Sequence, residues 1–296
     1  MPGIKKVKDY LKYLFALVAI FFLLKYIYKN WYAVSLYQWR FKYGLLVIAF
    51  GILGLNFLFL IQIWRDLLSR FSYKLPFRKA FKIWSYSNLG KYVPGKIWSV
   101  MGMVYMCEKE NIPYAATFTS AIMYQALNII AGMILVVVIS GAELTKGMSK
   151  FIYLPLALVL IVFAYPPIME KSTNFLLKLI KREPIKVSLS FGDNIVFILL
   201  LILGWCVYGI GFNVLVSSLT DYPLGLWPYM TSAFAFSYII GFLAIFVPGG
   251  FGVREGILIS YLSVYFPLPI ATIIALFSRL WMTVMEAFGF LVSTRL

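Results

Sequence analysis

The 296-residue chain is strongly apolar and strongly basic. Hydrophobic residues make up 62% of it, charged residues only 13%, and the formal net charge is +16. Soluble domains average about 45–50% apolar and about 25% charged residues, so this composition indicates an integral membrane protein without a large soluble catalytic domain. The chain has no histidine, and its two cysteines, Cys107 and Cys206, are far apart. We therefore expect no His-based catalytic triad, no disulfide framework, no metal site and no cofactor.

Six apolar segments are long enough to cross a bilayer as helices, which takes about 20 residues. They cover residues 11–28, 43–63, 114–140, 151–168, 194–219 and 270–292. The first follows three lysines, as the apolar part of a signal peptide would. It ends, however, near Tyr28 and Trp31 instead of at a small-residue cleavage site. We therefore interpret it as a retained span.

Two further apolar regions, residues 81–106 and 227–266, each contain a helix-breaking turn near the middle. The turns are Pro94-Gly95 and Pro248-Gly249-Gly250. A non-helical turn at membrane depth is tolerated only where protein covers it or where it lines a water-filled cavity. We therefore predict that each region is a re-entrant hairpin of two half-length helices.

The distribution of lysine and arginine supports the first hairpin. With both hairpins in place, one face receives most of the 27 basic residues, including those of the loops at 65–82 and 171–186. The positive-inside rule makes this face cytoplasmic, which predicts a multi-pass plasma-membrane protein with both termini in the cytoplasm. If the first region crossed fully, the basic loop at 171–186 would lie on the wrong side. If the second region crossed fully, only Arg295 would change sides. The prediction of the second hairpin therefore depends on its turn alone.

Three predicted crossings separate the two hairpins, and this odd number gives them opposite orientations. We predict an all-α polytopic membrane protein with six full spans, two re-entrant helical hairpins and an inverted repeat. The chain forms one transmembrane domain, with an N-terminal span and loop at 1–42 and halves at 43–150 and 151–296. Discontinuous helices in inverted repeats are typical of transporters, whose substrates bind at the breaks.

Charged side chains next to the first turn are candidates for phosphate binding. Lys91 and Lys96 flank Pro94-Gly95. Together with backbone N–H groups of the turn, they offer positive charge and donors to a phosphate. The alternative is that both lysines only extend to the headgroups at the membrane surface.

A second group of charged residues lies near the second turn and in the last span. Arg254 and Glu255 follow the turn, while Arg279 and Glu286 share one helical face of the last span. Charged side chains inside a membrane are costly, so they usually pair or line a pathway. We expect Arg279 to pair with Glu255, and Glu286 with Arg254. Whether Arg254 and Glu255 pin the hairpin or contact a ligand stays open.

These patterns define one set of candidate substrate-binding residues, all at the two turns or on the last span. They are Lys91, Pro94, Gly95, Lys96, Pro248, Gly249, Gly250, Arg254, Glu255, Arg279 and Glu286.

The two turn regions carry a resemblance to a known family. Residues 87–98, SNLGKYVPGKIW, and 247–256, VPGGFGVREG, resemble the two signature stretches of the lysylphosphatidylglycerol synthase transmembrane-region family, also called flippase-like domain proteins. The resemblance covers the chain from about residue 43 onward. It implies a membrane unit that flips lysylphosphatidylglycerol in the aminoacyl-lipid enzymes of the family, where a separate soluble domain transfers the amino acid. Without that domain here, it implies a stand-alone lipid translocator.

Two classes of function remain. The first is a flippase that moves an anionic or polyprenyl-phosphate-linked lipid between leaflets by alternating access. The second is a membrane-embedded transferase, or an accessory subunit of a glycosyltransferase, that uses Glu108, Glu110 or Glu255. For the second class, the sequence lacks a D-x-D motif to bind a metal and a nucleotide sugar, and it lacks histidine. We therefore favour the flippase and expect no enzymatic activity.

The expected partners follow from the net charge. Attraction to anionic headgroups accounts for the basic face, and no basic-aromatic module for nucleic acid is present. We expect the membrane and an anionic or polyprenyl-phosphate lipid as partners, and no nucleic acid. A second copy of the chain or an enzyme of the same pathway stays open as a partner.

Overall fold

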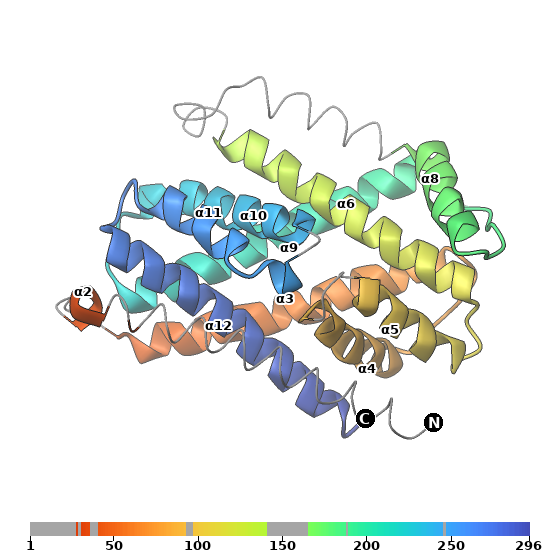
Figure 1. Ribbon diagram of the computed structural model, residues 1–296, viewed down its shortest axis with the longest axis horizontal. Helices are drawn as coiled ribbons and strands as arrows, with labels where there is room; N and C mark the ends of the chain where they lie inside the picture. Colours follow the sequence, from red (N-terminus) through yellow and green to blue (C-terminus); the bar gives the residue numbers. More distant parts are fainter. Residues whose placement is uncertain are drawn as a thin grey trace.

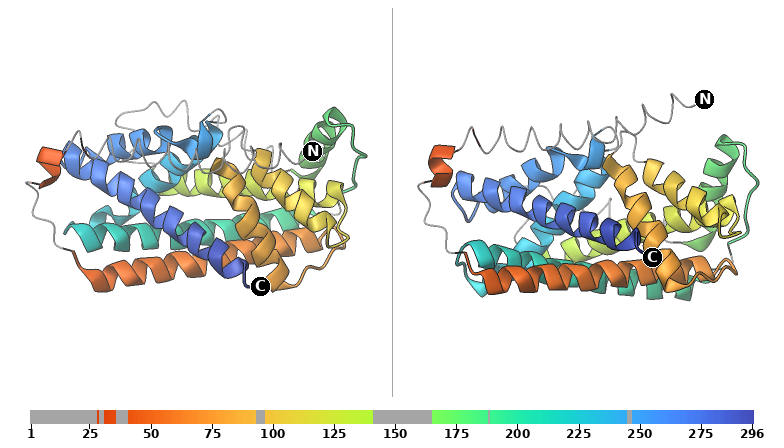
Figure 2. Two further views of the ribbon diagram at one scale, coloured as in Figure 1. Left: turned by 60° about the horizontal axis from the view of Figure 1, so that its bottom comes forward. Right: turned by 90° about the horizontal axis from the view of Figure 1, so that it is seen from below.

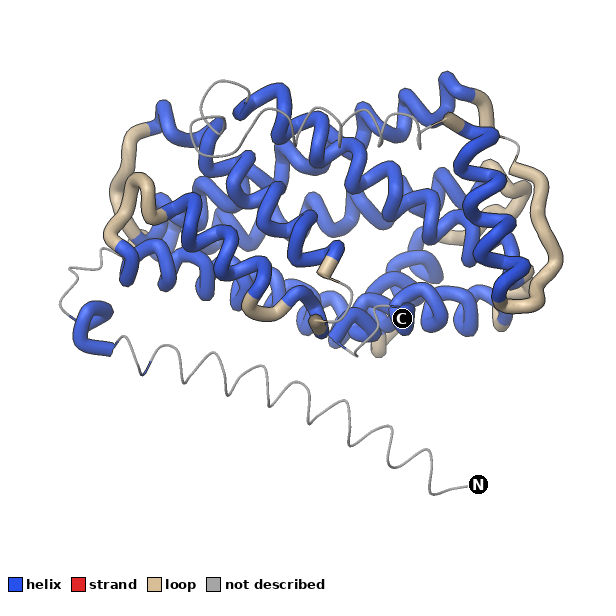
Figure 3. The backbone as a smooth tube through the Cα atoms, turned by 45° about the horizontal axis from the view of Figure 1, so that its top comes forward, coloured by secondary structure: helices blue, strands red, loops and turns tan. Residues whose placement is uncertain are grey.

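The computed structural model describes residues 28, 31–35, 41–92, 97–140, 165–187, 189–244 and 247–296. Within these ranges every regular element is a helix, and most of the loops lie at the two ends of the helices (Figure 3). The predicted span at 11–28 lies outside the described residues apart from Tyr28. Of the predicted span at 151–168, only residues 165–168 are described, and helix α8 (Pro166–Leu179) begins there.

Five of the described helices are long and apolar enough to cross a membrane. They are α3 (Tyr43–Ser69), α6 (Tyr114–Ser140), α9 (Phe191–Leu219), α10 (Trp227–Leu243) with the preceding 3₁₀ turn η3 (Leu224–Leu226), and α12 (Leu268–Ser293). Helices α3 and α9 lie side by side (Figure 2). The polytopic all-α prediction is confirmed.

Apolar side chains face both inward and outward, as a membrane protein requires. Inside the bundle, the Phe212 ring of α9 stacks on the Phe234 ring of α10 with centroids 4.6 Å apart. On the outside, Val47 and Leu55 of α3 are 71% and 69% exposed. Lipid tails would cover such side chains in a bilayer, whereas in water they would form an unfavourable apolar surface.

Contacts between helix ends define two ends of the molecule. At one, Arg70 after α3 pairs with Asp193 of α9 at 3.0 Å, and Arg182 lies 4.4 Å from the Tyr114 ring centre at the start of α6. At the other, Lys42 before α3 pairs with Asp221 after α9. The first end carries the segments 70–82 and 178–186, which include loops and helix ends and hold many of the described lysines and arginines. We call it the basic end, and the other the opposite end.

The first predicted hairpin is a pair of short helices joined by a break. It consists of α4 (Phe77–Asn88), the 3₁₀ turn η1 (Leu89–Tyr92) and α5 (Ile97–Glu108). Each α-helix has 12 residues, or about 18 Å, which is too short to cross a bilayer. Lys79 pairs with Glu110, so the outer ends of both helices lie together at the basic end. Helix α4 starts four residues before the predicted boundary at 81, because Pro76 can begin a helix but cannot continue one.

The second predicted hairpin is also broken, but its two arms are unequal. After α10 come the 3₁₀ turn η4 (Pro248–Gly250) and α11 (Val253–Leu262), which has only 10 residues. The Tyr229 hydroxyl donates to the Tyr261 carbonyl at 3.0 Å, so the outer ends of α10 and α11 lie together. The prediction of two half-length helices is wrong for α10, which with η3 is long enough to cross. The helix continues to Leu243 because the proline and most of the glycines of the break come only at 248–252.

The two broken regions open toward opposite ends of the long axis, and their turns meet in the middle (Figure 1). Phe266, after α11, packs against Tyr222, after α9, with ring centroids 5.9 Å apart, which places this hairpin's outer end at the opposite end. The opposed arrangement is the one that an inverted repeat needs. The repeat itself and the re-entrant character of the hairpins stay predictions.

The second turn needs glycine for steric reasons. Gly249, Gly250 and Gly252 have φ angles of 56°, 68° and 81°, in the region that side chains with a Cβ avoid. A Cβ on Gly250 would also lie 2.4 Å from the Gly241 carbonyl oxygen of α10. The backbone of the second turn thus packs directly against the backbone of α10 at Gly241.

We predict that Gly250→Ala lowers the free energy of unfolding by about 1–3 kcal/mol, because the strained φ and the contact with Gly241 both oppose a Cβ. Gly256→Ala in α11 is the matched control, since a Cβ there meets nothing within 4 Å. Alanine favours a helix over glycine, so the control is neutral or stabilising. Thermal unfolding of both variants in detergent checks this, and equal stability of the two would contradict it.

Candidate functional site

Three segments from distant parts of the sequence meet where the two turns touch. They are η1, the segment from η4 to the start of α11, and the middle of α12. A Cβ built on Gly249 would lie 2.9 Å from an Arg279 nitrogen of α12 and 3.4 Å from the Tyr92 ring of η1. We call this meeting point the hairpin junction. Protein therefore covers the irregular backbone at Gly249, as irregular backbone in a membrane must be covered.

Arg279 attaches the second turn to α12. Its NH1 donates to Glu255 Oε1 at 2.8 Å, and its NH2 donates to the Gly249 carbonyl at 3.2 Å. The other carboxylate oxygen of Glu255 accepts from the Gly252 backbone N–H at 2.6 Å, which caps α11. Both side chains of the pair are more than nine-tenths buried. The predicted pairing of Arg279 with Glu255 is confirmed.

Glu286 attaches the first turn to the same helix. It pairs with Lys91, and its Oε2 accepts from the Tyr92 hydroxyl at 2.8 Å. The Tyr92 hydroxyl also lies 3.3 Å from the Thr283 hydroxyl. The predicted pairing of Glu286 with Arg254 is therefore wrong, because the first turn reaches Glu286 in the folded chain, and the sequence spacing did not reveal this long-range contact.

Arg254 is the cation of the junction that makes no ion pair with any described residue. Its guanidinium carbon lies 5.2 Å from the Phe234 ring centre and 5.4 Å from that of Tyr238. Its NH2 reaches the Ser278 hydroxyl at 3.4 Å, and its Nε is buried without a hydrogen-bond partner. Such cation–π contacts stabilise a buried guanidinium only in part. Arg254 thus keeps positive charge and a free donor available.

The described residues of the junction carry a surplus of positive charge. Three cations, Lys91, Arg254 and Arg279, face two carboxylates, Glu255 and Glu286, so one positive charge is unbalanced. A buried unpaired charge is expensive. An anion at this position would balance it.

The structure brings together most of the candidate residues from the sequence. Seven of them lie at the junction, namely Lys91, Gly249, Gly250, Arg254, Glu255, Arg279 and Glu286. An eighth, Pro248, begins the turn η4 with its backbone. Pro94, Gly95 and Lys96 lie outside the described residues. Sequence reasoning missed Tyr92 and Ser278, although each directly follows or precedes a candidate cation, and it missed the aromatic contacts of Arg254.

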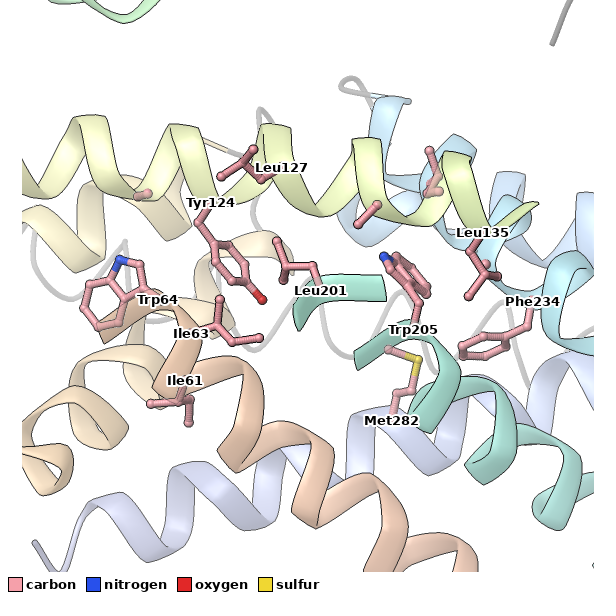
Figure 4. Packing of buried hydrophobic residues seen from close by; sticks show 14 of the residues in the cluster. Ile61, Ile63, Trp64, Tyr124, Leu127, Leu135, Leu201, Trp205, Phe234 and Met282 are labelled. Atoms are coloured by element: carbon pink, nitrogen blue, oxygen red, sulfur yellow. The ribbon is translucent and has the colours of Figure 1, made fainter. Parts of the chain in front are cut away.

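A cavity of about 110 Å³ adjoins the junction. It lies among α3, α4, α5, α6, α9, α10 and α12, and Glu286 forms part of its wall. In Figure 4, the side chains of Trp64, Tyr124 and Trp205 extend from α3, α6 and α9 into the space between these helices. The junction therefore adjoins an internal space of the bundle. Among the described residues, no group of three or more Cys, Asp or Glu side chains is placed to hold a metal ion.

We predict that Arg279 and Glu255 are energetically coupled. Arg279→Met leaves the Glu255 carboxylate buried without its partner, which costs about 3–5 kcal/mol. Adding Glu255→Gln removes that charge but keeps an acceptor for the Gly252 N–H, so the double variant is more stable than Arg279→Met alone. A double-mutant cycle of unfolding free energies in detergent measures the coupling, and strict additivity would exclude it.

Comparison with protein-family models matches residues 10–288 to the lysylphosphatidylglycerol synthase TM region. Neither curated proteins nor solved structures gave a match. The match agrees with the resemblance of the two turn motifs and points to a role connected with membrane lipids. Since it covers most of the chain, the protein belongs to the lysylphosphatidylglycerol synthase TM region family.

Proposed function

We propose that this protein is a flippase that moves a lipid with a phosphate-bearing headgroup between the two leaflets by alternating access. An anionic phospholipid and a polyprenyl-phosphate lipid both carry the required phosphate. The proposal depends on Arg254, which has no ion-pair partner among the described residues and lies at the hairpin junction. Its charge favours an anion, and its buried Nε needs an acceptor such as a phosphate oxygen.

The position of the junction supports translocation. The hairpin of α4 and α5 opens at the basic end, the arms α10 and α11 open at the opposite end, and the two turns meet between them (Figure 1). A site at that depth is reachable from either side when one hairpin moves against the other, as in transporters built from inverted repeats. The lipid tails would stay in the bilayer beside the bundle.

We also propose that the protein acts without covalent catalysis. Support comes from the chain's lack of histidine and from the engagement of both junction carboxylates. Arg279 and the Gly252 N–H bind Glu255, while Lys91 and Tyr92 bind Glu286. A carboxylate whose two oxygens already accept hydrogen bonds has little capacity left to take a proton from a substrate.

The orientation that we propose places the basic end in the cytoplasm and the protein in the plasma membrane. The lysine- and arginine-rich segments 70–82 and 178–186 lie at this end. Segments on the cytoplasmic side of membrane proteins carry an excess of these residues, which supports this orientation. The α4–α5 hairpin would then open to the cytoplasm and the α10–α11 pair to the outside.

We predict that Lys74→Cys is labelled from the cytoplasm and Ser263→Cys from the outside. Both residues are exposed, one before α4 and one after α11. The background lacks Cys107 and Cys206, and an impermeant maleimide is added to sealed vesicles of known orientation. Labelling of both positions from one side would rule out the opposed hairpins.

We predict that Arg254→Gln slows the transfer of an anionic phospholipid at least about tenfold. The reason is that a hydrogen bond to a charged group contributes about 1.5–3 kcal/mol, and about 1.4 kcal/mol is a factor of ten in rate. The assay follows a fluorescent short-chain phosphatidylglycerol in proteoliposomes, with unfolding temperature as a check on the fold.

The matched control is Arg295→Gln, which removes an exposed arginine near the C-terminus. We expect this variant to transfer the lipid like the wild type. If Arg254→Gln is folded and also transfers the lipid at the wild-type rate, Arg254 serves only packing, and the phosphate site must be abandoned.

A further inference from the structure

The cavity beside the junction differs in chemistry from the junction itself. Glu286 is the one charged side chain among the described residues that line it, and Lys91 and Tyr92 already bind its two oxygens. Arg254 and Arg279 do not line the cavity. Apart from Glu286, the described residues around the space are therefore neutral, although the space adjoins a cluster of cations.

Its walls combine aromatic faces with neutral hydrogen-bonding groups. The aromatic residues are Trp64, Trp84, Tyr124, Trp205, Tyr208 and Tyr238. The amides include Gln125 and Asn128, which lie three residues apart on one face of α6 and therefore point the same way. Such walls offer both donors and acceptors, and flat faces against which C–H groups can pack.

Two of the lining groups have no hydrogen-bond partner among the described residues. They are the Ser87 hydroxyl of α4 and the Trp64 indole N–H of α3, and both residues are buried, with only 4% and 0% of their surface exposed. Buried polar groups in proteins almost always have a partner. A ligand with hydroxyl groups supplies partners for both.

We infer that this cavity binds the uncharged, hydroxyl-rich part of a lipid headgroup, while the phosphate of the same headgroup lies against the cations of the junction. The inference rests on the proposed function. Glu286 borders both places, so the two parts of the headgroup would be adjacent. The cavity measures about 110 Å³, and about 10–15 Å³ on the same measure is enough for one water molecule, so a group the size of glycerol fits.

A cationic headgroup is the main competitor, because aromatic cages also bind quaternary ammonium groups. Here the carboxylate that would attract such a cation is already neutralised by Lys91. The amides and unpartnered donors of the wall have no role with a trimethylammonium group, which cannot accept or donate a hydrogen bond. A polyol uses all of them.

The test compares short-chain lipids of equal charge. Dioctanoyl phosphatidylglycerol and dioctanoyl phosphatidylmethanol both carry one negative charge, but only the first has free hydroxyl groups. Binding to the purified protein in detergent is followed by tryptophan fluorescence, since Trp64, Trp84 and Trp205 line the cavity. We expect phosphatidylglycerol to bind about tenfold tighter, which corresponds to about 1.4 kcal/mol.

Two variants separate the cavity from the junction. Asn128→Leu removes the preference for phosphatidylglycerol and leaves the binding of phosphatidylmethanol unchanged. Arg254→Gln weakens the binding of both lipids by the same factor. Gln62→Leu on α3, where Gln62 donates to Asp66 at 2.7 Å outside the cavity, is the matched control and keeps the preference.

The possible failures can be told apart. Equal affinity of the wild type for both lipids, with Arg254→Gln still weakening them, overturns the polyol cavity but keeps the phosphate site. Binding that is independent of Arg254 overturns the phosphate site. If dioctanoyl phosphatidylcholine binds more tightly than phosphatidylglycerol, the cavity binds a cationic headgroup and the hypothesis of a polyol site is wrong.

Discussion

Two ion pairs attach the turns of both hairpins to one helix, and the remaining features of the site depend on them. Lys91 of the first turn binds Glu286, and Glu255 beside the second turn binds Arg279. Arg279 and Glu286 are seven residues apart on α12, so they lie on one face about two helical turns from each other. This spacing holds η1 in contact with η4, so each of these turns helps to cover the other. The free polar groups of a broken helix are thus kept from lipid, which would otherwise make such a break too costly.

The cost of burying these charges explains why the pairs are complete. Charged side chains inside a membrane are costly, and removal of one partner leaves the other exposed to that cost. Glu255 therefore has both carboxylate oxygens occupied, one by Arg279 and one by the backbone of Gly252. Arg254 differs, because no carboxylate among the described residues pairs with it. Its guanidinium lies near two aromatic rings and makes a long contact with the Ser278 hydroxyl. An unpaired buried charge next to fully paired ones indicates a functional role, because proteins depart from such rules mainly at functional sites.

The sequence predicted the features that depend on local chemistry. Pro248 and the glycines after it end α10 because their backbone cannot continue a helix, and the spacing of Arg279 and Glu286 follows from helical periodicity. The sequence did not predict which distant residue meets Glu286, since that depends on how the first turn packs against α12. The length of α10 was also misjudged, because a break located at 248–252 says little about how far back the helix extends. The cavity was missed because its walls come from seven helices that only the folded chain brings together.

The arrangement of the pairs also limits how the protein can open. Each pair attaches one turn, and the turns belong to hairpins that open at opposite ends, so the first hairpin can separate from α12 while Arg279 still holds the second turn. An anion that enters from the basic end reaches Lys91 and competes with Glu286 for it, which weakens the first attachment. The same anion is attracted by Arg254 near the second turn. A phosphate would therefore loosen one side of the junction while it supplies the charge that the other side lacks, whereas a neutral headgroup would do neither. If the protein moves a phosphate-bearing lipid as proposed, its selectivity for anions and its opening would have one physical origin, the unbalanced positive charge at the junction.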